Sequence, residues 1–144
     1  MAIKLGMEAQ LLYKVGGQGG AGTWVVLGNT RNVTLNLEAG EADVTTRANS
    51  GWRATVATLK EASVEFEMVW DTDDVGFAAI KDAFFDNDPL GFQILDAPPP
   101  GGEGLQADFS ITNFSRSEAL EEAITVSVTA KVTYSATAPT WIGG

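Results

Sequence analysis

Hydrophobic and polar residues alternate along much of the chain, which is the pattern of half-buried β-strands. The alternation is clearest at 64–70, where apolar residues are separated mainly by Glu65 and Glu67. It is longest at 124–134, where aliphatic residues alternate with Ser, Thr and Lys. Shorter or less regular β-type runs predict six further strands, at 10–15, 24–27, 33–37, 43–46, 90–95 and 105–111.

Glycine, proline and small polar residues mark the connections between these strands. Residues 16–22 and residues 97–104 are too rich in Gly and Pro for regular structure. Ala39-Gly40 predicts a tight connection to the segment 41–70, which reads as strand, loop, strand and strand.

One segment changes from a period of two to the period of an α-helix. Apolar residues recur at helical spacing in 72–85, and carboxylates crowd 71–74, where they cap a helix and favour its dipole. Pro89 cannot continue a helix, so we expect one α-helix at about 73–86.

These elements predict a mainly β fold. About eight strands with clean polar faces and one helix indicate an antiparallel β-sandwich or a partly closed barrel. A length of 144 residues fits one domain, so we expect residues 1–144 to form it, with flexible N- and C-terminal arms.

The charge and the missing residue types exclude several function classes. The net charge of −10 disfavours a surface that grips nucleic-acid phosphates. The chain has no Cys and no His, which removes disulfides, thiolate zinc sites and the usual general base. The N-terminus has neither a secretory signal nor a membrane span, so we expect the chain to stay where it is made and to have no membrane partner.

Two loop motifs have simpler structural explanations. The glycines of 17–22 fit G-x-G-x-x-G, but a β pattern follows them where a dinucleotide site needs a helix. Asp71, Asp73 and Gly76 resemble the start of a calcium loop, yet the fifth position would be Val75. Helix capping explains the acids better.

Glu65 and Glu67 form the one carboxylate pair with a spacing of interest. Their backbone positions lie about 6.6 Å apart on one strand face, near the separation of the two carboxyl groups in an inverting glycosidase. Neighbours on one strand rarely straddle a sugar, so a solvated or lumen-facing acidic row is the better interpretation. We therefore expect no enzyme activity, no catalytic or metal site and no cofactor.

The stretch 41–70 resembles the major tail tube proteins of long-tailed bacteriophages. The resemblance rests on EADVTTR at 41–47, Gly51-Trp52, a connection at Leu59 and ASVEF at 62–66 in this order. It covers about thirty residues most strongly and fits the element order of the whole chain. Related tubes occur in contractile injection and type VI secretion systems.

The resemblance implies a β-sandwich subunit with one helix, six of which make a ring. The rings would stack into a tube that DNA travels through without specific binding. Expected partners are copies of the chain itself and other tail proteins, such as the tape measure and tail terminator proteins. The expected location is the virion tail, assembled in the host cytoplasm.

Aromatic and basic residues in a polar loop and at the C-terminus are the candidate contacts between rings. Trp52 lies in a polar loop between Arg47 and Arg53, a composition typical of interface anchors. Without the resemblance, a Trp folded over its own sandwich is an equal alternative. The C-terminal Trp raises the same question, with disorder as its alternative. The expected inter-ring residues are Arg47, Asn49, Trp52, Arg53, Trp141 and Ile142, and Glu65 and Glu67 are the expected lumen-facing acids.

The alternative function is a monomeric β-sandwich that binds carbohydrate or protein, with Trp24 and Trp52 as stacking platforms. Self-assembly discriminates between the two, since only a tube subunit forms rings or tubes.

Overall fold

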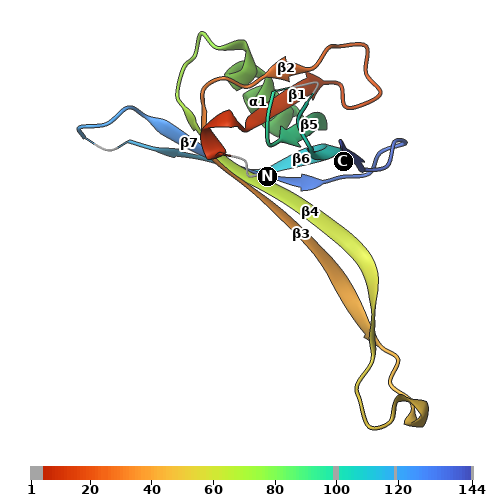
Figure 1. Cartoon of the computed structure of the whole chain (residues 1–144). Helices are drawn as coiled ribbons and strands as arrows, with labels where there is room; N and C mark the ends of the chain where they lie inside the picture. The colour runs from red at the N-terminus through yellow and green to blue at the C-terminus, as the bar shows by residue number, and fades with distance from the viewer. Residues whose placement is uncertain (1–4, 99–100, 119, 144) are drawn as a thin grey trace.

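The computed structural model describes residues 5–98, 101–118 and 120–143, and places eight strands and one α-helix there (Figure 1). The strands form one antiparallel sheet, in the order β2-β1-β5-β6-β7-β4-β3 with β8 beside β6, which curls into a half-barrel. The predicted mainly β fold with one helix is confirmed. Its elements are η1 (Gly6–Glu8), β1 (Gln10–Val15), β2 (Val25–Val26), β3 (Thr30–Asp43), η2 (Arg47–Asn49), β4 (Thr55–Val69), α1 (Val75–Asp86), β5 (Leu90–Leu95), β6 (Gly104–Ser117), β7 (Thr125–Val132) and β8 (Thr140–Ile142).

The hydrophobic core lies inside the curl of the sheet. The predicted alternation holds in β4, where Val64, Phe66 and Met68 are buried. Phe92 of β5 and Phe109 of β6 pack edge to face with ring centroids 5.6 Å apart. In β4 and β7 one apolar face therefore fills the interior and the other face stays polar, whereas β1 is buried on both faces, with Leu11, Leu12 and Tyr13 all covered.

Helix α1 covers this core and begins slightly later than predicted. Asp74 is the N-cap, since its Oδ2 accepts a hydrogen bond from the Phe77 N–H at 2.8 Å. The aspartates before the helix thus include its cap, as expected. Gly76 is buried, and a Cβ there would overlap the Leu27 side chain, so glycine lets α1 lie close to the segment after β2.

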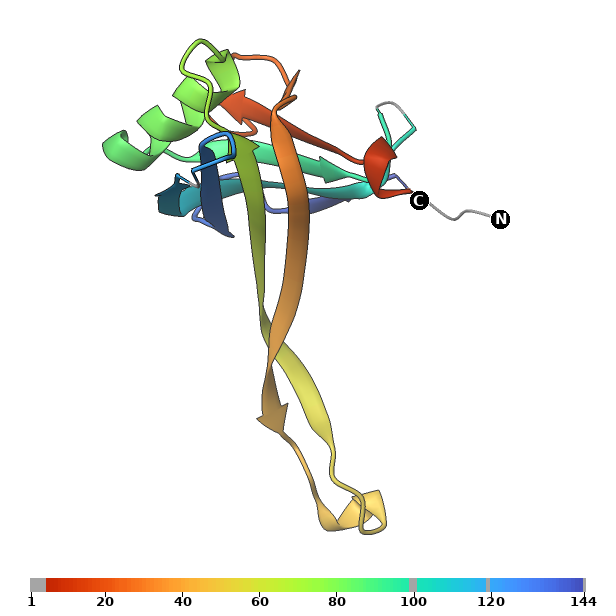
Figure 2. The same ribbon diagram turned by 90° about the vertical axis from the view of Figure 1, so that its left-hand side faces the viewer.

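The largest departure from the sequence prediction is a long hairpin of β3 and β4 that projects from the body (Figures 1 and 2). The expected connections at Ala39-Gly40 and at Leu59 are wrong, because both positions lie inside these strands. The pairing shifts between Ala39↔Lys60 and Glu41↔Ala57, which places one extra residue on β4. A Cβ on Gly40 would lie 2.6 Å from the Thr58 Oγ1, so glycine makes room for a bulge and does not turn the chain.

Some predicted boundaries also change. The strand expected at 43–46 ends at Asp43, and the strand expected at 105–111 is the longer β6. Residues 99 and 100 of the predicted Pro- and Gly-rich loop, and the outermost residues 1–4 and 144 of the expected arms, lie outside the described residues.

A buried carboxylate fixes the glycine-rich loop after β1. Asp108 is 6% exposed, and its Oδ1 accepts a hydrogen bond from the Gln18 backbone N–H at 2.6 Å. The Ser135 hydroxyl donates to its other oxygen. Gly17 has φ +83°, and a Cβ there would lie 2.7 Å from Asp108 Oδ1. Asp108 thus joins this loop and the segment after β7 to β6.

Candidate assembly surfaces

The polar face of the sheet carries a row of carboxylates. Glu65 and Glu67 point away from the core side of β4, as the alternation predicted, with Glu65 exposed and Glu67 half-buried. On the same face, farther toward the hairpin, Glu61 lies directly across from Glu38 of β3. Like charges directly opposite one another destabilise an isolated strand pair, so the acidic row does not stabilise the subunit.

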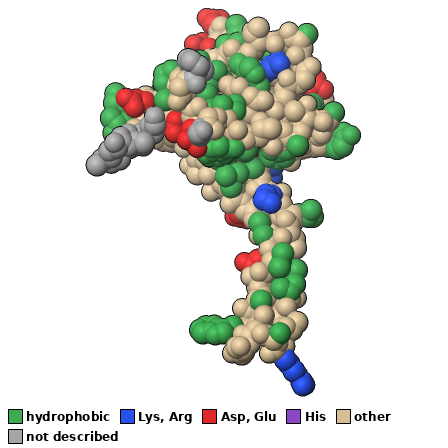
Figure 3. All heavy atoms as spheres, turned by 45° about the vertical axis from the view of Figure 1, so that its right-hand side comes forward, with side chains coloured by type: hydrophobic (Ala, Val, Ile, Leu, Met, Phe, Trp, Pro, Cys, Tyr) green, Lys and Arg blue, Asp and Glu red, His purple; other side chains and the backbone are tan. Residues whose placement is uncertain are grey.

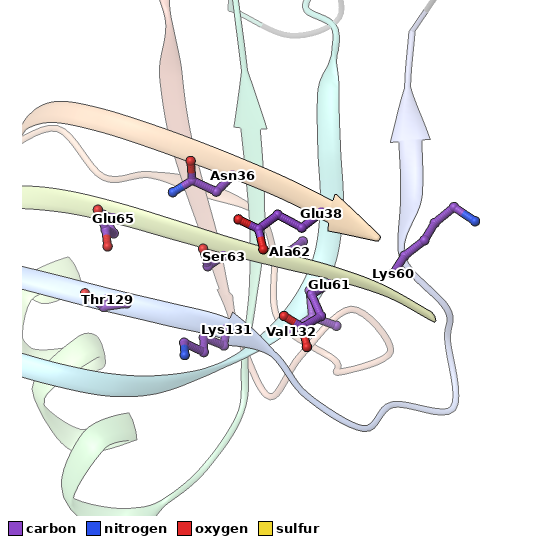
Figure 4. A pocket seen from close by; sticks show the side chains of 10 residues that line it. All are labelled: Asn36, Glu38, Lys60, Glu61, Ala62, Ser63, Glu65, Thr129, Lys131 and Val132. Atoms are coloured by element: carbon purple, nitrogen blue, oxygen red, sulfur yellow. The ribbon is translucent and has the colours of Figure 1, made fainter. Parts of the chain in front are cut away.

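The acidic row borders a shallow hollow on this face, with a volume of about 460 Å³ (Figure 4). Two cations lie on the same face as the acids. Arg31 is the cross-strand partner of Glu67, and Lys131 of β7 is the partner of Ser63. The residues that line the hollow come from β3, β4 and β7 and are Asn36, Glu38, Lys60, Glu61, Ala62, Ser63, Glu65, Thr129, Lys131 and Val132, and the Lys60 side chain points away from the others in Figure 4.

The bulge in β4 reverses the polarity of the hairpin faces. Before the bulge, Leu37 and Ala62 form a pair on the face that continues the core. Beyond it, that face carries Glu41, whereas Ala42 and Val56 pair on the face that continues the acidic row. Exposed apolar side chains therefore occur on both faces of the hairpin, among them Leu37, Val56 and Leu59 at 55%, 52% and 84% exposure.

The hairpin ends in a tight loop, residues 44–54, which we call the tip. Backbone hydrogen bonds close it, from Val44 N–H to the Ala54 carbonyl at 3.0 Å and from Trp52 N–H to the Asn49 carbonyl at 3.0 Å. Gly51 takes a positive φ of 85° in the turn before Trp52. These contacts hold the tip, and the side chains that it carries, in an ordered conformation.

The tip brings four of the predicted contact residues together. Trp52 is 77% exposed, so it does not fold over its own sandwich. Arg47 and Arg53 are exposed beside it and Asn49 is half-buried. In Figure 3, basic and hydrophobic side chains gather at the end of the hairpin. A cationic, aromatic surface at the end of a projecting arm is the composition of an interface anchor.

Local hydrogen bonds hold the acid nearest the tip. Asp43 accepts bonds from the Thr45 hydroxyl and from the Thr45 backbone N–H, and these lower the pKa of Asp43. Within residues 5–98, 101–118 and 120–143, the one ion pair is Arg116 with Glu118, so neither arginine of the tip is neutralised there.

The other two predicted contact residues lie in a separate place. Trp141 and Ile142 belong to β8, which pairs with the start of β6. The Trp141 indole N–H donates to the Glu103 carboxylate at 2.6 Å, and 53% of the side chain stays exposed. Trp141 also borders an apolar groove of about 590 Å³ with Leu11 and Leu35. Sequence reasoning missed this groove, because its walls come from strands far apart in the chain.

The chain matches the family model "Phage tail tube protein" over residues 9–137. It therefore belongs to the phage tail tube protein family and is a structural protein of that class. No curated protein matches it. Within the described residues, none of the helices is both long and apolar enough to cross a membrane.

Solved structures of tails share the fold. The virion of a native gene transfer agent particle contains a chain with a TM-score of 0.74 and 21% identity, and the match covers 98% of this chain and 100% of that one. A tail of an empty gene transfer agent particle with C6 symmetry gives 0.75 and 22%, with the same coverage. The SPP1 tail tube gives 0.76 and 16%, covering 99% of this chain and 80% of that chain.

Proposed function

We propose that this protein is the subunit of a hollow tail tube, in which six copies close into a ring and the rings stack. DNA passes through the bore without specific binding, and the role is structural and not enzymatic. The tube belongs to a virion tail assembled in the host cytoplasm. Its expected neighbours include the tape measure and tail terminator proteins.

The projecting hairpin is the observation that carries the proposal. A two-stranded ribbon is at best marginally stable alone in water, and this one exposes apolar residues on both faces and Trp52 at its end. The outer edge of β3 also has no strand beside it among the described residues. Neighbouring subunits would cover these surfaces, and the C6 symmetry of a similarly folded tail supports six of them.

The bore is the polar sheet face with Glu65 and Glu67. Six copies at −10 each carry −60, and on this face four acids, Glu38, Glu61, Glu65 and Glu67, outnumber the two cations Arg31 and Lys131, so a bore lined by it repels phosphates. The same repulsion opposes assembly, and apolar and oppositely charged contacts must outweigh it.

The two separate contact surfaces have different roles in this account. Arg47, Asn49, Trp52 and Arg53 at the tip contact the adjacent ring. Trp141, Ile142 and the neighbouring groove contact another subunit, so the C-terminal segment is part of an interface and not a free tail.

Analytical ultracentrifugation over a range of protein concentrations, with negative-stain microscopy of the same samples, tests the proposal. A tube subunit sediments as hexamers and longer particles that appear as rings and tubes. A 15.2 kDa monomer at every concentration and salt would instead favour the monomeric binding module.

A further inference from the structure

The tip of the hairpin is a cationic surface on a strongly acidic chain. Arg47 and Arg53 are two of only nine basic residues, against nineteen acids, and both flank the exposed Trp52. A partner suited to this tip offers carboxylates beside an exposed apolar side chain. Another copy of the same chain has such a surface.

We propose that the tip docks on the loop between β4 and α1 of a subunit in the adjacent ring. This loop, residues 70–74, presents the exposed carboxylates of Asp71 and Asp73, and it leads directly into Val75, which is 75% exposed. The inference rests on the proposed tube and adds the surface that receives the tip.

The receiving loop is held in a fixed shape. The Asp71 Oδ1 accepts a hydrogen bond from the Asp73 N–H at 3.0 Å, and the Asp74 N–H donates to the Asp71 carbonyl at 3.1 Å. Asp74 is occupied as the cap of α1. The Asp73 carboxylate and the Val75 side chain therefore face outward from an ordered turn, which lowers the ordering cost of docking.

The two surfaces lie at opposite ends of the molecule. In both Figure 1 and Figure 2, the tip lies at the bottom and the β4–α1 loop lies at the top of the body. Stacking copies along the hairpin direction brings the tip of one toward the loop of the next. Such a contact joins two different patches and does not close on itself, which is the symmetry of a filament.

The charges also explain why the tip carries arginine. Rings that each carry a large negative charge repel one another, and a cationic tip on an acidic loop replaces part of that repulsion with attraction. Arginine is enriched at interface anchors, where its planar guanidinium can bind a carboxylate in a bidentate manner.

Charge reversal tests the docking. Arg47→Glu with Arg53→Glu, and separately Asp71→Lys with Asp73→Lys, should each raise the protein concentration needed for half-maximal tube formation about tenfold or more. All four substitutions in one chain should bring that concentration back to within about threefold of the wild type, since the pairing is restored with its sign reversed. Asp73→Lys alone keeps the Asp71 turn and should show the same trend.

The matched control is Asp82→Lys with Asp86→Lys, which makes the same charge change at exposed positions of α1. Circular dichroism checks the fold, sedimentation measures tubes, and native mass spectrometry measures rings. The docking is refuted if the Asp71 and Asp73 variant forms tubes as readily as this control, or if the fourfold variant folds and forms rings but not tubes. If the wild type forms no tubes at all, the proposed function itself fails.

Discussion

Replacing Trp52 with Ala separates a contact in the tube from a contact in the subunit core. The side chain is 77% exposed in the subunit, and a Trp buries up to about 250 Å², so about 190 Å² is available to a neighbour. Covering all of that area contributes about 5 kcal/mol at about 25 cal/mol per Å². Truncation of a central anchor typically costs about 2 kcal/mol or more, so we expect about 2 to 5 kcal/mol per contact.

The substitution should change the folding stability of the isolated subunit only slightly. A loss of less than about 1 kcal/mol of folding stability corresponds to a melting temperature within about 4 °C of the wild type. Tube formation should fail at concentrations where the wild type assembles, because every subunit repeats the loss. Thermal unfolding and electron microscopy of the same sample measure both effects.

Tyr134→Ala is the control for this experiment, since it removes an aromatic side chain that is 92% exposed and lies outside the tip. It should leave both the melting temperature and the tubes unchanged. Truncating a core aromatic costs about 3 to 5 kcal/mol of folding stability, so a Trp52 variant that melts far earlier than the wild type would assign Trp52 to the subunit core. A variant that folds normally and still builds full-length tubes would remove the tip from the ring contacts.

Three further predictions concern the bore, the buried carboxylate and the pH dependence. Glu65→Lys with Glu67→Lys should leave the tubes intact and make them bind DNA in a salt-dependent way; unchanged DNA binding by intact mutant tubes would place both residues outside the bore. Asp108→Ala removes the acceptor of a buried backbone N–H and of a hydroxyl, so urea unfolding should show a loss of about 2 to 4 kcal/mol, and a wild-type midpoint would contradict the role of this carboxylate. Burial, and next the charge of Asp74, raise the pKa of the Tyr13 phenol in the folded state. The neutral phenol therefore contributes stability below its ordinary pKa of about 10, and this contribution is lost as the pH rises through the pKa of the folded state. As the pH rises above 10, the free energy of unfolding should therefore fall less for Tyr13→Phe than for the wild type. An equal fall in both proteins would refute the raised pKa of Tyr13.

The sequence predicted the strands by their alternation but misjudged the hairpin. Ala39-Gly40 has the composition of a turn, yet a small residue in a strand also fits where another backbone or side chain approaches closely. In this fold the approach comes from Thr58, eighteen positions along the chain, and no local pattern reveals it. The length of the hairpin therefore depends on a long-range contact that periodicity does not report.

The helix shows the same limit on a smaller scale. Three aspartates precede it within four residues, and each is a good N-cap by residue type. Only the packed structure selects Asp74, because the close approach of Gly76 to Leu27 fixes where the first turn lies. The alternation did establish which face Glu65 and Glu67 share, since a period of two allows no other arrangement within one regular strand.

The contact residues could be picked by type but not placed relative to one another. Trp and Arg in a polar loop indicated a surface anchor, and the tip holds Trp52, Arg47 and Arg53 exposed. Nothing in a three-residue segment such as 140–142 distinguishes a free tail from a strand. β8 forms because the edge of β6 between Gly104 and Gln106 is open to it.

A cryo-electron microscopy reconstruction of the particles formed by the purified wild-type protein tests the central claim most directly. We predict stacked rings with sixfold symmetry, the sheet face of Glu65 and Glu67 lining an open bore, and the hairpin of each subunit reaching the adjacent ring. Particles without a continuous bore, or a bore lined by the opposite sheet face, would contradict the account.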